Sequence, residues 1–264
     1  MRKIGLEEQK KILIDMLKYI DEVCRKNKIN YSLMYGSLIG AIRHNGIIPW
    51  DDDIDIGLVS EEYDKLMDAL EKDNDSYYKI LDPERNKNYA YPFAKLVDTR
   101  TTLIEKGVKE IDDYGVYIDI FRLHYVSNNS FFRKMHYKIL FFTETVFARA
   151  MLYPKYIKNI KSKLIVIIAN IIGVNFLKKR HLKLCVNKKK TDYVICDWPE
   201  YGVERETFKR SSFDKYKRVK FENIEAMIVD DYDSVLRTTF GDYMQLPPEE
   251  ERSPRHNTEI YWKK

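Results

Sequence analysis

Four aspartates, Asp51, Asp52, Asp53 and Asp55, fall within five positions of this chain, directly before an apolar, strand-like run. Ionised carboxylates repel one another, and crowding them costs free energy unless a cation compensates. Crowded oxygen ligands suit Mg²⁺ or Mn²⁺, and these ions commonly handle phosphates. The cluster therefore predicts a divalent-cation site that supports phosphoryl chemistry.

A further carboxylate extends this predicted site. Alternate side chains of a strand share a face, so Asp53 and Asp55 would point the same way, joined by Asp51 if the extended conformation begins at Trp50. Asp119 lies in a second apolar run and could complete the metal shell or take a proton from an attacking hydroxyl. A solvated surface turn is the alternative for an isolated cluster of aspartates, and the combination with Asp119 argues against it.

Gly36 and Ser37 follow a predicted strand over 29–35 and open a short predicted helix over 37–43. Glycine lets backbone amides approach a phosphate, and a helix N-terminus adds a favourable dipole. These two residues are therefore predicted to contact substrate.

Composition bounds the class of protein. The 264 residues include 44% hydrophobic and 33% charged residues, as in ordinary globular proteins. Three cysteines without a CxxC pair argue against a disulfide scaffold and a zinc ribbon, and the N-terminal residues lack the apolar core of a signal peptide. We expect a cytoplasmic protein.

The elements that must position these residues follow from hydrophobic spacing. We predict helices over 6–27 and from a capping Ser60 onward, and mostly helical segments over 129–152 and 155–187 that Pro154 separates. Strands are predicted over 29–35, 53–59, 77–81, 91–98, 101–105 and 115–123. The predicted class is α+β, a mixed sheet flanked by helices. Residues 1–128 would form the catalytic core, 129–190 a basic helical subdomain, and 191–264 a segment completing the core.

Several strings in this chain resemble the LicD family, a branch of the nucleotidyltransferase superfamily that is related to fukutin-related proteins. They are Tyr35-Gly-Ser-Leu-Ile-Gly-Ala-Ile-Arg-His44, Ile48-Pro-Trp-Asp-Asp-Asp-Ile-Asp55, Ala94-Lys-Leu-Val-Asp98, Gly115-Val-Tyr-Ile-Asp-Ile-Phe121 and Phe240-Gly-Asp-Tyr-Met-Gln-Leu-Pro-Pro-Glu-Glu250. The resemblance implies a nucleotidyltransferase-like core. It also implies transfer of phosphocholine from CDP-choline to a sugar hydroxyl of a teichoic acid, capsule or lipopolysaccharide precursor.

In that reaction Asp51, Asp53, Asp55 and Asp119 would hold Mg²⁺ or Mn²⁺, with Asp119 as the base for the acceptor hydroxyl. Lys95 would neutralise transition-state oxygens, a solvated strand lysine being the alternative. CDP-ribitol or CDP-glycerol is the alternative donor. A non-catalytic protein that binds membrane surfaces is the contrasting class.

Four more residues are candidates for substrate binding. Arg43 and His44 could contact the pyrophosphate or cytidine, or pair with the acidic run on the surface. Trp50 and Tyr117 could form a cation–π wall for a trimethylammonium group, although aromatic residues beside strands more often belong to the core.

The chain departs from the family pattern in two places. The family string after the third aspartate is commonly Phe-Pro-Leu-Asp, whereas this chain has Phe121-Arg-Leu-His124. We expect that change to alter the acceptor side of the site. Ser37 stands where threonine is frequent, which is a mild change.

Charge is sorted along the chain. No acidic residue lies between Glu144 and Asp192, a span that also contains the apolar run 164–174. About 20 apolar residues are needed to cross a bilayer, so this run is too short. We expect it to lie in the interface of an anionic membrane, near a lipid-linked or polymeric glycan acceptor, a buried core helix being the alternative. Nucleic-acid binding is not expected, because no such motif is present.

Overall fold

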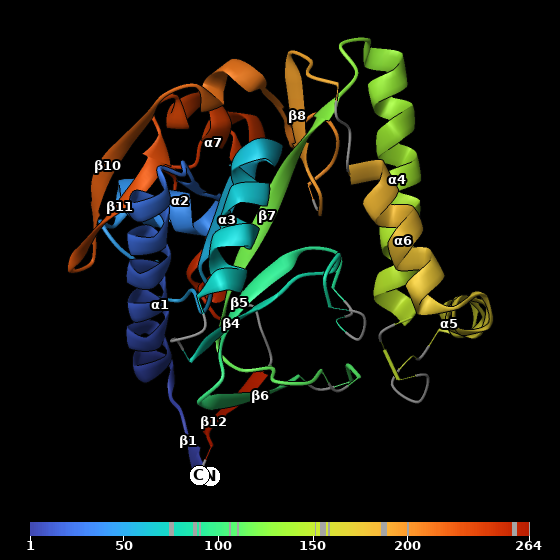
Figure 1. Ribbon diagram of the computed structural model, residues 1–264, viewed down its shortest axis with the longest axis horizontal. Helices are drawn as coiled ribbons and strands as arrows, with labels where there is room; N and C mark the ends of the chain where they lie inside the picture. Colours follow the sequence, from blue (N-terminus) through green and yellow to red (C-terminus); the bar gives the residue numbers. More distant parts are fainter. Residues whose placement is uncertain are drawn as a thin grey trace.

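The computed structural model describes residues 1–264 except 74–76, 87–88, 90, 106, 110, 151, 154–156, 158, 186–188, 200, 255–257 and 264. Over these residues a mixed sheet forms the centre of the molecule (Figure 1). Its strand order is β2 (Ser32–Leu33), β3 (Asp55–Val59), β7 (Tyr117–Val126), β5 (Ala94–Asp98) and β4 (Tyr78–Leu81). Strands β3 and β7 are parallel, and the other neighbours in this order are antiparallel.

Residues from the last third of the chain extend this framework. Strand β8 (Tyr193–Cys196) pairs with the second half of β7, and β9 (Thr207–Lys209) pairs with β8. Strands β10 (Tyr216–Phe221) and β11 (Ile224–Val229) form a hairpin, and a small sheet joins β1 (Arg2–Lys3), β12 (Thr258–Trp262) and β6 (Thr101–Glu105). Segments far apart in sequence therefore meet around the centre.

Helices α1 (Leu6–Asn27) and α3 (Ser60–Lys72) pack together on one side of the central sheet (Figure 1). The apolar stripe of α1, from Leu13 to Cys24, is buried there. Ser60 does not cap α3, contrary to the prediction: the capping position is Val59, and the Ser60 hydroxyl donates to the carbonyl oxygen of Leu123. Helices α2 (Tyr35–Arg43) and α7 (Tyr232–Phe240) contact each other elsewhere in the fold.

Helices α4 (Ser130–Ala150), α5 (Ile160–Ile172) and α6 (Val174–Cys185) form a separate layer (Figure 1). The prediction that 155–187 is mostly helical is confirmed over the described residues, and two helices form there because the chain turns at Gly173, whose φ of 96° suits glycine. Pro154, the predicted separator, lies outside the described residues. Among the described helices, none is both long and apolar enough to cross a bilayer.

The mixed sheet with flanking helices agrees with the predicted α+β class. The likeness of this sheet to nucleotidyltransferases and the domain boundaries after residues 128 and 190 stay predictions.

Candidate active site

Three charged side chains form one row across the middle of the central sheet. Asp55 on β3 is in register with Asp119 on β7, and Asp119 is in register with Lys95 on β5. Register partners on neighbouring strands project from the same face, and all three residues line one cavity of about 650 Å³. Two carboxylates predicted from separate parts of the sequence therefore lie side by side.

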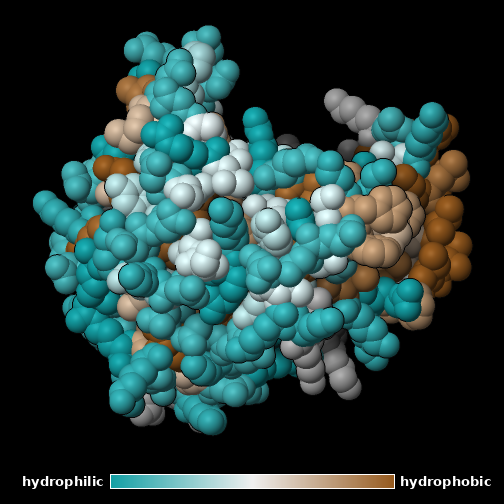
Figure 2. All heavy atoms as spheres, turned by 90° about the horizontal axis from the view of Figure 1, so that it is seen from above, coloured by the Kyte–Doolittle hydropathy of each residue, from teal (hydrophilic) through white to brown (hydrophobic). Residues whose placement is uncertain are grey.

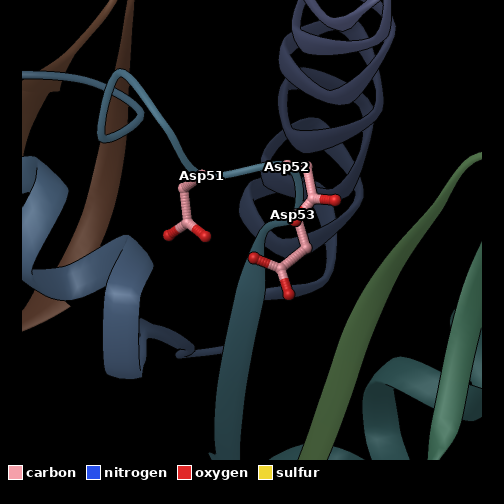
Figure 3. Close-up of side chains that lie close together, drawn as sticks. All are labelled: Asp51, Asp52 and Asp53. Carbon is pink, nitrogen blue, oxygen red and sulfur yellow. The ribbon is translucent and has the colours of Figure 1, made fainter. Parts of the chain in front are cut away.

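Asp51 and Asp53 reach the same cavity from the loop before β3, although the strand itself begins only at Asp55. Figure 3 shows these two side chains together with that of Asp52; one carboxylate oxygen from each of the three lies within 4.8 Å of the others. Asp52, however, lines a separate small crevice with Gln9 of α1. The large cavity thus contains the four carboxylates predicted as metal ligands.

The four carboxylates carry more negative charge than Lys95 can balance. Burial, and then the charges of Asp53, Asp119 and Asp51, raise the pKa of Asp55 well above its ordinary value. A divalent cation would relieve this repulsion, and carboxylate oxygens are the ligands that Mg²⁺ and Mn²⁺ prefer. The donor set therefore fits the expected ion.

Lys95 is closed to solvent, with 2% of its surface exposed. Its Nζ forms an ion pair with Asp119 Oδ1 and lies 3.5 Å from the centroid of the Tyr117 ring. The alternative of a solvated strand lysine is therefore excluded. Tyr117 lines the cavity as well, but it already offers a ring face to the ammonium group of Lys95.

Gly36 and Ser37 lie in the first turn of α2, and each contacts a different aspartate. The Ser37 hydroxyl oxygen accepts a hydrogen bond of 2.9 Å from the backbone amide of Asp55, and Ser37 is not among the residues that line the cavity. Gly36 does line it, and a Cβ there would lie 2.6 Å from Asp51 Oδ2. Glycine at this position leaves room for the Asp51 carboxylate.

Arg43 joins α2 to the C-terminal part of the cavity wall. Its Nη1 donates to the carbonyl oxygens of Tyr243, at 2.8 Å, and Gln245, at 3.1 Å, so it is not a surface partner of the acidic run. His44 accepts from Arg43 Nε at 3.0 Å and does not line the cavity. Trp50 lines it, with the guanidinium of Arg252 5.5 Å from its ring.

An aromatic wall lies beside the carboxylates; its members are Phe93, Phe121, Trp198, Tyr201 and Phe240. The ring centroids of Phe93 and Trp198 are 5.5 Å apart, and those of Tyr201 and Phe240 are 5.2 Å apart. Sequence reasoning missed this wall. Phe240 and Phe121 stand in strings that resemble the family, but Trp198 and Tyr201 follow β8 in a stretch without a local signal.

The departure from the family pattern lies on the other face of β7. Arg122 is buried and pairs with Asp64 and Glu84, each at 3.0 Å, while His124 is buried beneath the helical layer beside His136. Neither side chain lines the cavity. The expectation that these residues alter the acceptor side of the site is therefore not supported by their placement.

Comparison with known proteins agrees with this geometry. Residues 28–158, about half of the chain, match the family described as LicD/FKTN/FKRP, nucleotidyltransferase domain. The matched part contains the row of Asp55, Asp119 and Lys95 together with Asp51 and Asp53. The chain belongs to the LicD family.

Named relatives of this LicD-family protein include transferases. It is 29% identical to the lipopolysaccharide cholinephosphotransferase LicD of Haemophilus influenzae, with 99% of each chain covered. It is 42% identical over 50 residues to the ribitol 5-phosphate transferase FKRP of mouse and of human, which covers 19% of this chain and 10% of FKRP. The similarity to the Haemophilus protein thus extends over the C-terminal residues that supply Trp198 and Phe240.

Proposed function

We propose that this LicD-family phosphotransferase moves phosphocholine from CDP-choline to a sugar hydroxyl of a cell-envelope glycan precursor, as in teichoic acid, capsule or lipopolysaccharide synthesis. One observation carries the proposal. Four carboxylates and Lys95 face an aromatic-walled cavity of about 650 Å³ in a chain that is similar end to end to a cholinephosphotransferase. That volume is ordinary for a site that holds a small organic ligand.

Asp51, Asp53, Asp55 and Asp119 would hold Mg²⁺ or Mn²⁺. When bound, the ion supplies positive charge that offsets the diphosphate oxygens. The acceptor hydroxyl oxygen attacks the phosphorus that carries choline, the bond to the CMP oxygen breaks, and Asp119 takes the hydroxyl proton. Lys95 keeps Asp119 ionised and in place and adds positive charge beside the phosphoryl oxygens.

The ion pair with Lys95 weakens Asp119 as a base, because it stabilises the carboxylate. Proton transfer to Asp119 is therefore expected late, once the forming P–O bond has acidified the hydroxyl.

The donor alcohol distinguishes two versions of this proposal. Aromatic faces attract a quaternary ammonium group, so the wall of Phe93, Trp198 and Tyr201 favours choline. The local similarity to FKRP favours ribitol phosphate, and glycerol phosphate is a related alternative. We place the reaction on the cytoplasmic side of the cell membrane, with a lipid-linked or polymeric glycan as acceptor.

The proposal is tested by measuring CMP release from CDP-choline in the presence of a glycan acceptor, with and without Mg²⁺. We expect release that requires the metal and that exceeds release from CDP-ribitol and CDP-glycerol. Asp53→Asn should abolish it, whereas the matched variant Asp52→Asn, next in sequence but facing the small crevice, should retain most of it. Absence of release from all three donors would favour the non-catalytic class, and preference for a polyol donor would favour the alternative.

A further inference from the structure

Helix α5 presents an apolar stripe to solvent. The stripe, which we call the α5 stripe, consists of Ile160, Leu164, Ile167, Ile168, Ile171 and Ile172, all exposed. Their spacing of three and four residues places them along one side of the helix. Exposed apolar surface of this extent is unusual in a monomer and marks a binding surface. The alternative of a buried core helix is thus excluded for this face.

The α5 stripe faces outward because the opposite side of α5 packs on the protein. Val166 and Ala169 are buried, and α5 contacts α4 and α6. Helix α6 is in turn fixed to the rest of the fold, since Lys178 Nζ donates to the carbonyl oxygens of Asn86, at 3.0 Å, and Tyr89, at 2.9 Å. The helical layer is therefore anchored on its inner side.

Further apolar side chains are exposed on the same layer. Helix α4 exposes Phe131, Phe132, Met135, Ile139, Phe141 and Phe142. Figure 2 shows hydrophobic atoms gathered at the end of the molecule that this layer forms, with hydrophilic atoms around them. The surface is thus larger than one helix.

The charges on α5 and α6 are of one sign. Lys161 and Lys163 are exposed on α5, Lys179, Arg180 and Lys183 are exposed on α6, and no acidic residue occurs between Glu144 and Asp192. Cations beside an apolar stripe complement anionic headgroups above acyl chains. A second copy docking symmetrically on the same face would bring like charges together, which disfavours self-association.

We propose that the α5 stripe inserts into the headgroup–acyl boundary of an anionic bilayer. A helix of 13 residues is about 20 Å long, too short for a hydrocarbon core of about 30 Å, so α5 lies parallel to the surface. This inference rests on the helical layer alone and does not depend on the proposed reaction.

A fluorophore on the α5 stripe tests the proposal in the full chain. Ile171→Cys would be labelled with an environment-sensitive dye; Cys24, Cys185 and Cys196 are buried and label poorly. Vesicles of phosphatidylcholine mixed with phosphatidylglycerol should shift its emission to the blue, and phosphatidylcholine alone should do so weakly. The same dye on Lys26→Cys, exposed on α1, should not respond.

Charge variants make the test quantitative. The pair Lys161→Gln and Lys163→Gln should weaken binding to the anionic vesicles about 25-fold, since each lysine near such a surface contributes about a factor of five. The matched pair Lys18→Gln and Lys26→Gln on α1 should change it less than about twofold. No shift at position 171, an equal shift at position 26, or a shift produced by raising protein concentration without vesicles would overturn the proposal, the last in favour of a second copy.

Discussion

Lys95 and Asp119 stand directly opposite each other on β5 and β7, and their ion pair is almost closed to solvent. Both side chains face the cavity that contains Asp51, Asp53 and Asp55. The lysine thus offsets one of four crowded carboxylates, and it is held there by the Tyr117 ring. This pair links the stability of the fold to the proposed chemistry.

Lys95→Met should destabilise the metal-free protein by roughly 3–5 kcal/mol, because the buried Asp119 carboxylate loses its partner. Urea unfolding measures this change. Lys65→Met is the matched control: Lys65 is exposed where it pairs with Glu62, and loss of this pair should cost less than about 1 kcal/mol. Equal losses of unfolding free energy in the two variants would show that the buried Lys95–Asp119 pair stabilises the fold no more than the Lys65–Glu62 pair does.

Ser37→Ala should lower kcat and destabilise the fold by about 1–3 kcal/mol, because the partly buried amide of Asp55 loses its acceptor. Ser37→Thr keeps a hydroxyl at this position and should keep most of the activity. Steady-state kinetics of CMP release, together with thermal unfolding, compares the two. If threonine proved as damaging as alanine, the hydrogen bond would not be the reason for the serine.

Trp198→Leu should raise KM for CDP-choline by about three- to thirty-fold if the aromatic wall binds the quaternary ammonium group. Trp198→Phe keeps a ring and should show a smaller effect, and KM for CDP-glycerol should change little in either variant. A uniform rise in KM for both donors would assign Trp198 to nucleotide binding or packing instead.

Stability should fall as the pH drops from about 6.5 toward 4. His181 on α6 donates from Nε2 to the carbonyl oxygen of Asp197, and burial lowers the pKa of His181 to about 4. As the pH falls, the unfolded chain takes up the proton before the folded chain does. Protonation therefore stabilises the unfolded state in this window, and the free energy of unfolding decreases. Denaturant unfolding across this range checks the slope, which His181→Gln should reduce; an unchanged slope would assign it to other groups.

Period-two patterns made the carboxylate side of the site predictable. Asp55 and Asp119 are flanked by isoleucines that face a core, so each had to point to the opposite face of its strand. The order of the strands in the sheet cannot be predicted from the local sequence of each strand. The direct pairing of β5 with β7, which buries Lys95 beside Asp119, depends on contacts between residues 24 positions apart.

Long-range assembly also explains what sequence reasoning missed. Trp198 and Phe240 reach the cavity only because β8 pairs with β7 and α7 packs beside α2. The position of Asp52 depends on the course of a loop, where strand alternation does not apply. In the helical layer, Gly173 belongs to the apolar run 164–174, although its positive φ ends α5.

Asp51, Asp53, Asp55 and Asp119 are proposed to bind one divalent ion together. Titration with Mn²⁺ followed by electron paramagnetic resonance measures this in the absence of substrate. We predict saturable binding by the wild-type chain that weakens at least about tenfold in Asp53→Asn and changes little in Asp52→Asn. Absence of binding, or an equal loss in the two variants, would show that these four carboxylates do not form the ion site.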